Sequence, residues 1–315
     1  MERKINPISR VNQSLEDISD NIQMRSDPSV YFKQPRSRLD DIFNRSKLEK
    51  RRYLCVENKW ERLLFKYKAC CEQHLTDYIL NSYFYMSDSS QLNDPFDLKS
   101  NVIFDKTSFD AYFYKKHLIS KYKPKFKERK KLQNRMSNPD DIQQQIRQSF
   151  LKSIKNTGIH SFTNTCKNLL MWAQYADKHQ GVCLIFEVCE DIDTFTSALK
   201  INYSKNYPVV KYMHEKNGAD LIEKPFLTKS EDWKYESEWR IFDLEKAKHY
   251  LYFKPKSLFG IILGAKITET NKKMVYSLLR QRAKKGFPEV KVFDARCSDT
   301  EYKLQIWRNN SSYYC

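Results

Sequence analysis

Two glutamates, Glu236 and Glu238, lie in a stretch of alternating residue types that runs from Trp233 to Arg240 (WKYESEWR). Alternation is the side-chain period of a β-strand, so the stretch predicts a strand with an aromatic face and a charged face. On such a strand the two carboxylates project side by side, about 6 to 7 Å apart. They could together contact one sugar, one metal ion or a pair of hydroxyls, so Glu236 and Glu238 are candidate catalytic residues.

The same pattern also allows a structural interpretation. Lys234 and Arg240 flank the two glutamates on the charged face, and neighbouring charge pairs are common on sheets. The acids could therefore form an ion-paired ladder, with Arg240 as a structural partner rather than part of a reaction site.

A polar loop, residues 91–97 (QLNDPFD), follows a short run of β-forming residues at 81–86. Asn93 and Asp94 can hydrogen-bond to neighbouring backbone groups, and Pro95 disfavours a helical conformation at Asp94. We expect either a fixed loop that presents Asn93 and Asp94 to a site, or a turn that only ends the strand.

Residues 160–188 predict a helix followed by a buried strand. Asn164 or Thr165 could cap the helix, Gly181 could end it in a left-handed conformation, and the apolar run 182–188 (VCLIFEV) reads as the strand. Further elements are expected at 61–68, at 258–263 (LFGIIL) and in a helix over 271–285. Three side chains within residues 160–188 are further site candidates, although each is also typical of a structural or core position: His160, Trp172 and Tyr175.

The chain of 315 residues carries a formal net charge of +17, and residues 106–159 hold 14 Lys and Arg against 4 Asp and Glu. Such a concentration of charge favours nucleic acid as a partner, or forms a solvated basic helix. We expect a polar N-terminal extension over residues 1–55 and one α+β domain over residues 56–315, with a basic helical insertion at about 106–159.

Neither a membrane span nor an export signal is evident in the sequence. We therefore expect a cytoplasmic protein whose eight cysteines are reduced thiols, because none of them form the C-x-x-C pairs typical of zinc sites. A structural metal is not expected.

Three stretches together resemble the bacterial and phage family known as domain of unknown function 2971: residues 84–97, 160–186 and 231–242. The resemblance covers roughly residues 60–305, without the basic insertion, and suggests a phage-defence or mobile-element context. Gln174 stands where the family's Trp-x-His-Tyr pattern has a histidine, which removes any general acid from that position.

The arrangement also looks like the ADP-ribosyltransferase fold, a single mixed sheet with surrounding helices. That resemblance implies NAD as the substrate cofactor, with Glu238 holding the ribose 2′-hydroxyl and Glu236 orienting the acceptor. It further implies Arg62 or Lys66 at the pyrophosphate. The remaining implied cofactor contacts are Ser87 at the nicotinamide ribose and Tyr85 stacked on an aromatic ring.

Two other functions fit the same residues. A metal-dependent nuclease could use Asp94, Asp97, Glu236 and Glu238 to bind Mg²⁺ and orient water. A non-catalytic module could instead bind nucleic acid through its basic segment, with the aromatic stripe at Trp233 and Trp239 serving as core. The leading hypothesis is an NAD-using ADP-ribosyltransferase or NAD glycohydrolase that acts on nucleic acid.

Overall fold

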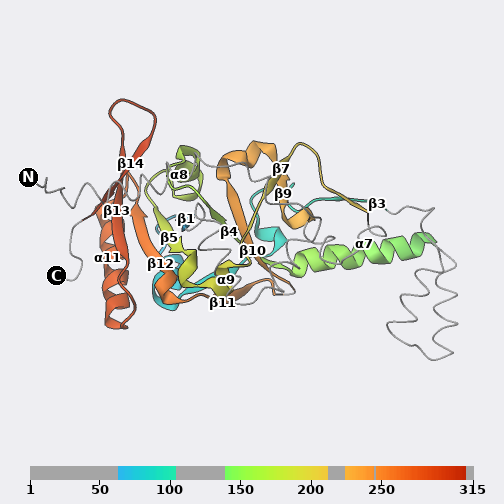
Figure 1. The fold of residues 1–315 in the computed structure, drawn as a ribbon, viewed down its shortest axis with the longest axis horizontal. Helices are drawn as coiled ribbons and strands as arrows, with labels where there is room; N and C mark the ends of the chain where they lie inside the picture. The colour runs from blue at the N-terminus through green and yellow to red at the C-terminus, as the bar shows by residue number, and fades with distance from the viewer. Residues whose placement is uncertain (1–62, 104–138, 212–223, 245, 310–315) are drawn as a thin grey trace, which may run out of the picture.

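The computed structural model describes residues 63–103, 139–211, 224–244 and 246–309. Its centre is a mixed sheet of eight strands in the order β14-β13-β12-β5-β1-β4-β10-β6 (Figure 1). Only β12 and β13 are parallel neighbours in this sheet, and all other neighbouring pairs are antiparallel. The prediction of an α+β fold built on one mixed sheet is confirmed.

The strands of the large sheet are β1 (Leu63–Lys68), β4 (Gly158–Thr163), β5 (Val182–Glu187), β6 (Leu199–Lys200), β10 (Glu238–Asp243), β12 (Leu258–Leu263), β13 (Lys291–Cys297) and β14 (Leu304–Arg308). Three two-stranded sheets accompany it: β2 (Tyr83–Met86) with β11 (His249–Tyr252), β3 (Asn101–Ile103) with β8 (Val209–Lys211), and β7 (Asn202–Ser204) with β9 (Thr228–Ser230).

The helices are α4 (Glu72–Thr76), the π-helix η4 (Asp77–Asn81), α7 (Pro139–Asn156), α8 (Leu169–Tyr175), α9 (Ile192–Phe195) and α11 (Glu269–Lys284). The 3₁₀ helices are η5 (Ser89–Gln91), η6 (Val188–Glu190), η7 (Glu231–Glu236) and η8 (Pro255–Ser257).

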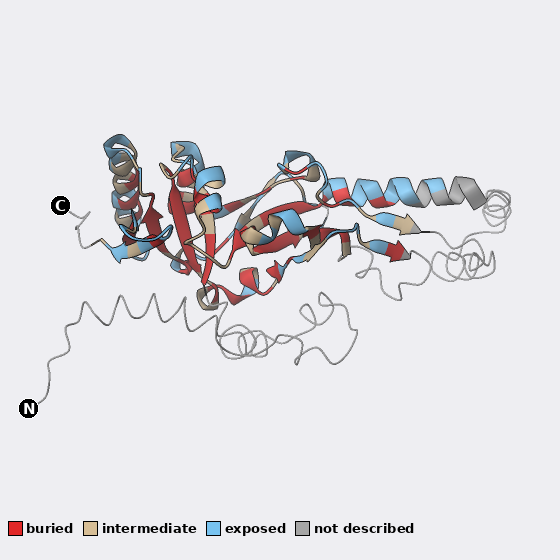
Figure 2. Cartoon of the chain, turned by 90° about the horizontal axis from the view of Figure 1, so that it is seen from above, coloured by how far each residue is buried: buried red, intermediate tan, exposed pale blue. Residues whose placement is uncertain are grey.

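Both faces of the central strands are buried, which explains their continuous apolar sequences. On β5, Leu184 and Phe186 face the core beneath η4 and α11, whereas Cys183 and Ile185 face the core beneath α8. Figure 2 shows this buried centre as a red band between more exposed helices. The strand predictions at 182–188 and 258–263 correspond to β5 and β12.

Helix α8 begins later than expected, because Asn168 rather than Asn164 or Thr165 accepts the amides of its first turn. Gly181 does not end it in a left-handed conformation; Asp177, Lys178 and His179 adopt positive φ instead. Gly181 is required for a different reason. A Cβ atom there would lie 2.2 Å from the carbonyl oxygen of Lys68.

The large sheet has a gap along one edge of β4. Strand β1 pairs with all six opposing residues of β5 but meets β4 only at Phe65 opposite Thr163. At its other end, β4 forms an isolated bridge between Ile159 and Ser87, directly after β2. Between these two attachments, residues 160–162 have no backbone partner on this side within the described part of the chain.

Helix α7 covers the C-terminal part of the predicted basic insertion and extends away from the sheet (Figure 1). Its last turns are fixed by Phe150 and Ile154, which pack with Ile159 and Phe242. The predicted extension 1–55, Arg62 and residues 106–138 of the insertion lie outside the described residues.

Cys189 is disulfide-bonded, so the prediction that all cysteines are free thiols is wrong at this position. The other cysteines within the described ranges are free, namely Cys70, Cys71, Cys166, Cys183 and Cys297. No helix within these ranges is long and apolar enough to cross a membrane.

Candidate active site

The gap beside β4 is occupied by a cavity of about 260 Å³. Strands β1, β2, β4, β9 and β10, helix α8, η7 and the polar loop 91–97 all contribute to its wall. The polar residues that the argument below uses are Lys66, Tyr85, Ser87, Asn93, Asp97, His160, Ser161, Tyr175, Lys229, Glu236, Glu238 and Arg240.

The two glutamates reach this cavity from different elements, so the prediction of a continuous strand from Trp233 to Arg240 is wrong. Ser230 caps the 3₁₀ helix η7, which ends at Glu236, and Ser237 then adopts a left-handed conformation with φ of 45°. Strand β10 begins at Glu238. The turn redirects the chain so that both carboxylates still point to one place.

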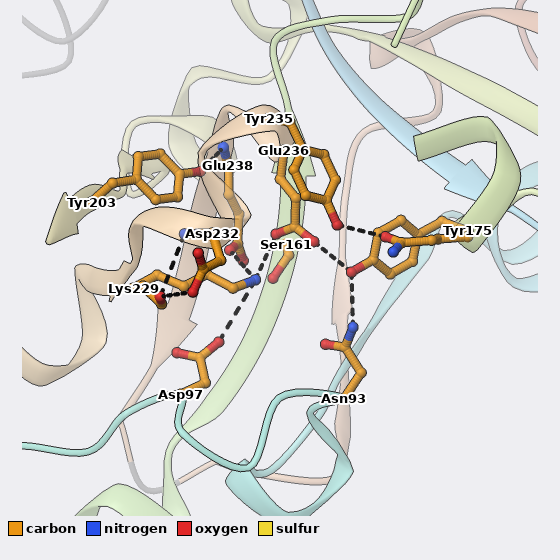
Figure 3. Close-up of polar contacts among 12 residues, drawn as sticks. Asn93, Asp97, Ser161, Tyr175, Tyr203, Lys229, Asp232, Tyr235, Glu236 and Glu238 are labelled. Carbon is orange, nitrogen blue, oxygen red and sulfur yellow. Dashed lines mark hydrogen bonds and ion pairs between the residues drawn. The ribbon is translucent and has the colours of Figure 1, made fainter. Parts of the chain in front are cut away.

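Lys229 on β9 joins the two carboxylates (Figure 3). Its Nζ lies 2.5 Å from Glu236 Oε2, 3.0 Å from Glu238 Oε2 and 3.9 Å from Asp97 Oδ2. Burial would lower the pKa of Lys229, but the glutamates outweigh it and raise that pKa above its usual range. The ammonium is therefore charged. Sequence reasoning missed Lys229, because no diagnostic spacing relates it to the glutamates.

Arg240 provides the second cation. Its Nε donates to Glu238 Oε1 at 2.7 Å, and its two terminal nitrogens donate to the carboxylate of Asp97 at 3.0 and 2.5 Å. The expected pairing of the glutamates with Arg240 is present for Glu238. Lys234, however, is exposed, and Glu236 pairs with Lys229 rather than with Lys234, which the ladder interpretation had as its partner.

The pKa values of the two glutamates shift in opposite directions. Burial alone would raise the pKa of Glu238, but the charges of Arg240 and Lys229, together with hydrogen bonds from Arg240 and Ser161, hold it at about 2. For Glu236, burial raises the pKa, and the charge of Glu238 adds to this effect, whereas Lys229 opposes it. Glu238 is thus a fixed anion, and Glu236 is the more basic carboxylate.

Tyr175, the last residue of α8, orients Glu236. Its hydroxyl donates to Glu236 Oε1 at 2.5 Å and accepts a hydrogen bond from the amide of Asn93 at 2.9 Å (Figure 3). Both oxygens of Glu236 are therefore held, one by Tyr175 and the other by Lys229. The neighbouring Gln174 is exposed and accepts a hydrogen bond from Tyr235 instead.

The opposite wall of the cavity carries Lys66 and His160. Lys66 Nζ donates to the backbone oxygen of Ser161 at 2.6 Å, and burial lowers its pKa to about 7. Burial also holds the pKa of His160 well below its usual range, so its ring is neutral. Since His160 Nδ1 lies 3.0 Å from the carbonyl oxygen of Tyr85, Nδ1 carries the proton and Nε2 keeps a free lone pair.

Most of the described residues singled out in the sequence line this cavity, and two of them, Trp172 and Asp94, do not. Trp172 is fully buried under α8, where its ring packs edge-on against Tyr67 and its Nε1 donates to Cys166. Asp94 accepts the amide of Phe96 and stabilises the polar loop from outside the cavity. Arg62 lies outside the described residues.

The carboxylates form a poor metal site. Asp97, Glu236 and Glu238 already surround one ammonium and one guanidinium group, so Mg²⁺ would have to displace Lys229. Within the described residues, no group of three or more His, Cys, Asp or Glu side chains is arranged to hold a metal ion. The donor set therefore gives the Mg²⁺-dependent nuclease hypothesis no specific support.

One family model matches the chain. Its description reads "Protein of unknown function (DUF2971)", and the match covers residues 171–241. This stretch runs from α8 into β10 and includes Tyr175, Lys229 and both glutamates. The resemblance to this family is confirmed over these residues, which contribute Tyr175, Lys229, Arg240 and both glutamates to the cavity wall. No curated protein and no solved structure matches the chain.

Proposed function

We propose that the cavity cleaves the bond between nicotinamide and ribose in NAD, as an NAD glycohydrolase or an ADP-ribosyltransferase. The observation that carries the proposal is the pair of carboxylates in one cavity whose pKa values are pushed apart, with that of Glu238 held at about 2 and that of Glu236 raised. Such a pair supplies a permanent anion and a separate proton acceptor, which glycosidic bond cleavage requires.

Glu238 is assigned to the ribose. Departure of neutral nicotinamide breaks the C1′–N bond and leaves positive charge on the ribose, so a fixed carboxylate stabilises charge that exists only in the transition state. The cations Arg240 and Lys229 keep Glu238 ionised at neutral pH and restrict its rotation. A hydrogen bond from the ribose 2′-hydroxyl would hold the sugar against it.

Glu236 is assigned to the acceptor. Water or an acceptor hydroxyl attacks C1′ and gives up a proton, and a carboxylate with a raised pKa accepts that proton more readily than an ordinary one. The products are nicotinamide and either ADP-ribose or an ADP-ribosylated acceptor, with one proton released. Tyr175 and Asn93 fix the direction in which Glu236 presents its oxygens.

The remaining wall suits the rest of the substrate. With a pKa of about 7, Lys66 is only partly protonated at neutral pH before the substrate enters. An entering pyrophosphate would stabilise its charged form. Ser87 and Tyr85 lie where a ribose and an aromatic ring could contact them. The cavity is somewhat smaller than the roughly 300 to 1,000 Å³ of typical ligand sites, so it accommodates the reacting part of the dinucleotide and leaves the remainder at its rim.

The test is release of nicotinamide from NAD, measured by chromatography, because both reactions produce it. Glu238→Gln should reduce the rate by about a hundredfold or more, in line with loss of one fixed transition-state contact. Glu269→Gln changes an exposed glutamate on α11 and should leave the rate unchanged. Circular dichroism must show that both variants fold. Equal rates for the two variants, or no nicotinamide release by the native protein with water or nucleic acid as acceptor, would refute the proposal.

The sequence predicts a cytoplasmic location, and this remains part of the proposal. A protein in the cytoplasm would meet NAD directly. Nucleic acid recruited by residues 106–159 remains the proposed acceptor from sequence, and α7 contributes Arg147, Lys152 and Lys155 to that segment.

A further inference from the structure

Four tyrosines form a continuous exposed surface on the small sheet of β2 and β11. Tyr85 lies directly opposite Tyr250, and Tyr83 lies directly opposite Tyr252. The rings of Tyr252, Tyr83, Tyr250 and Tyr85 follow one another with centroid separations of 6.1, 5.8 and 5.5 Å. We call these four side chains the tyrosine platform.

The platform is not required to bury the sheet. The opposite face of the same two strands carries Phe84, Met86 and Leu251, and these pack into the main core. Tyr250 and Tyr252 remain 50% and 53% exposed, although tyrosine pairs of this kind usually cover one another or a neighbouring element. About half of each of these two side chains is therefore available to a partner with flat aromatic groups.

Lysines flank the platform at both ends. Residues 246–256 (KAKHYLYFKPK) contain four lysines and no acidic residue. Lys246 and Lys248 precede β11, and Lys254 and Lys256 follow it; about half or more of each side chain is exposed. Five residues lie between the inner two lysines, Lys248 and Lys254, a span of about 20 Å along an extended chain.

Each of these lysines already pairs with an acid, and most of those acids are less exposed than their partners. Asp88 is almost fully buried beneath Lys248, and Asp243 and Glu190 are largely covered beneath Lys246 and Lys256. Only the pair of Lys254 with Asp193 presents both groups to solvent. The outer surface around the platform therefore presents mainly ammonium groups.

We propose that the tyrosine platform binds single-stranded nucleic acid, with bases stacked on the tyrosine rings and phosphates near the flanking lysines. Exposed aromatic rings within a basic surface are the combination by which proteins hold single strands without reading their sequence. The chain's net charge of +17 favours the same polyanionic partner. Neither a duplex nor a neutral polymer would satisfy both features.

The platform also reaches the cavity. Tyr85 belongs to both, and its hydroxyl bonds to Gln91, another cavity residue. If the proposed function holds, a strand lying on the platform would bring its end to the part of the cavity wall that Tyr85 forms. The binding inference does not depend on that function, because binding can be measured without NAD.

The test is fluorescence anisotropy with labelled single-stranded RNA and DNA of about twelve nucleotides and the full-length protein. The double variant Tyr250→Ala, Tyr252→Ala should weaken binding of both strands at least about fivefold for each ring removed. Tyr302→Ala is the matched control, because Tyr302 is fully exposed in the connection between β13 and β14. Tyr250→Trp should keep the native affinity.

Three results would overturn the inference. The native protein could bind neither RNA nor DNA single strands. The double alanine variant could bind as tightly as Tyr302→Ala, which would place the binding surface elsewhere. A duplex of the same length could compete as well as the single strand, which would indicate contact with phosphates alone. Thermal unfolding of each variant separates loss of binding from loss of fold.

Discussion

Lys229 is the residue whose removal tests the described charge arrangement most directly. Its side chain is 4% exposed and lies within 4 Å of three carboxylates, those of Asp97, Glu236 and Glu238. In Lys229→Met only Arg240 remains as an ion-pair partner among the described residues, and Glu236 loses the ammonium group that pairs with it. Methionine is unbranched and of similar length, so the change removes mainly charge rather than volume.

The expected cost follows from the burial of the cluster. Removing one partner from a buried ion pair typically costs about 3 to 5 kcal/mol, because it leaves an uncompensated charge. Since whole domains are stable by about 5 to 15 kcal/mol, this is roughly a fifth or more of the total free energy of unfolding. The midpoint of thermal unfolding should fall by roughly 6 to 20 °C.

The loss should also depend on pH. In Lys229→Met, burial and the charge of Glu238 raise the folded-state pKa of Glu236 further above its unfolded value. The folded form then binds more protons than the unfolded form between those two values, so its stability falls as the pH rises through that range. The deficit relative to the native protein should therefore be larger at about pH 8 than at about pH 5.

Urea unfolding of the native protein and Lys229→Met at both pH values measures this directly. Lys246→Met is the matched control, because Lys246 is largely exposed and forms a surface pair with Asp243 at 3.3 Å. Such a pair contributes no more than about 1 kcal/mol. If both variants lose the same stability, or if the deficit of Lys229→Met does not change with pH, the described cluster does not stabilise the fold as we infer.

Three further predictions concern the stability of the fold. At about pH 6, Lys66→Met should be more stable than the native protein by about 2 kcal/mol, and this gain should disappear toward pH 10.5. The gain is smaller than the full pKa shift of Lys66 implies, because this side chain keeps some exposure. The unfolded form keeps the Lys66 proton up to the ordinary pKa of 10.5, whereas the folded form loses it near pH 7. The stability of the native protein should therefore rise between these two pH values. Urea unfolding that shows no such rise would contradict the prediction. Gly264→Ala should destabilise the fold by about 1 to 3 kcal/mol, because its Cβ would lie 2.2 Å from the backbone oxygen of His179. Gly286→Asn is at a left-handed position with nothing within 4 Å of an added Cβ, so it should cost less than about 1 kcal/mol. Thermal unfolding of both glycine variants measures the two costs.

The buried strands were predictable because strands that are buried on both faces have almost continuously apolar sequences. β5 and β12 lie inside the sheet with helices on both faces, so nearly every side chain is apolar and the run itself marks the strand. Helix α11 was equally clear. Its apolar positions recur at helical spacing, and Gly286 follows it with a positive φ of 74°.

The stretch 233–240 misled the prediction because alternation of residue types does not require a strand. In the 3₁₀ helix η7, residues three apart lie on one side, so Trp233 and Glu236 both contact Lys229. That lysine comes from a different strand. Its influence on the local conformation is a tertiary effect, and no periodicity within residues 233–240 records it.

The candidate site was predictable by residue type but not by partner. Glu236 and Glu238 were correctly identified as neighbours in space, yet their partner Lys229 stands alone in the sequence without a diagnostic spacing. Asp97 was considered only as a metal ligand, although it forms a bidentate pair with Arg240. Trp172 illustrates the converse, since its conspicuous sequence motif serves the core.

The incomplete pairing of β4 explains why a cavity exists at the centre of an otherwise continuous sheet. Full pairing with β1 would place backbone groups where the cavity now lies, because the next register position after Phe65 opposite Thr163 would join Tyr67 to Ser161. The backbone oxygen of Ser161 instead accepts the Lys66 ammonium group. A side chain that titrates near neutral pH thus replaces a backbone hydrogen bond. An anion that binds Lys66 in the cavity would favour its charged form and so strengthen this contact with Ser161.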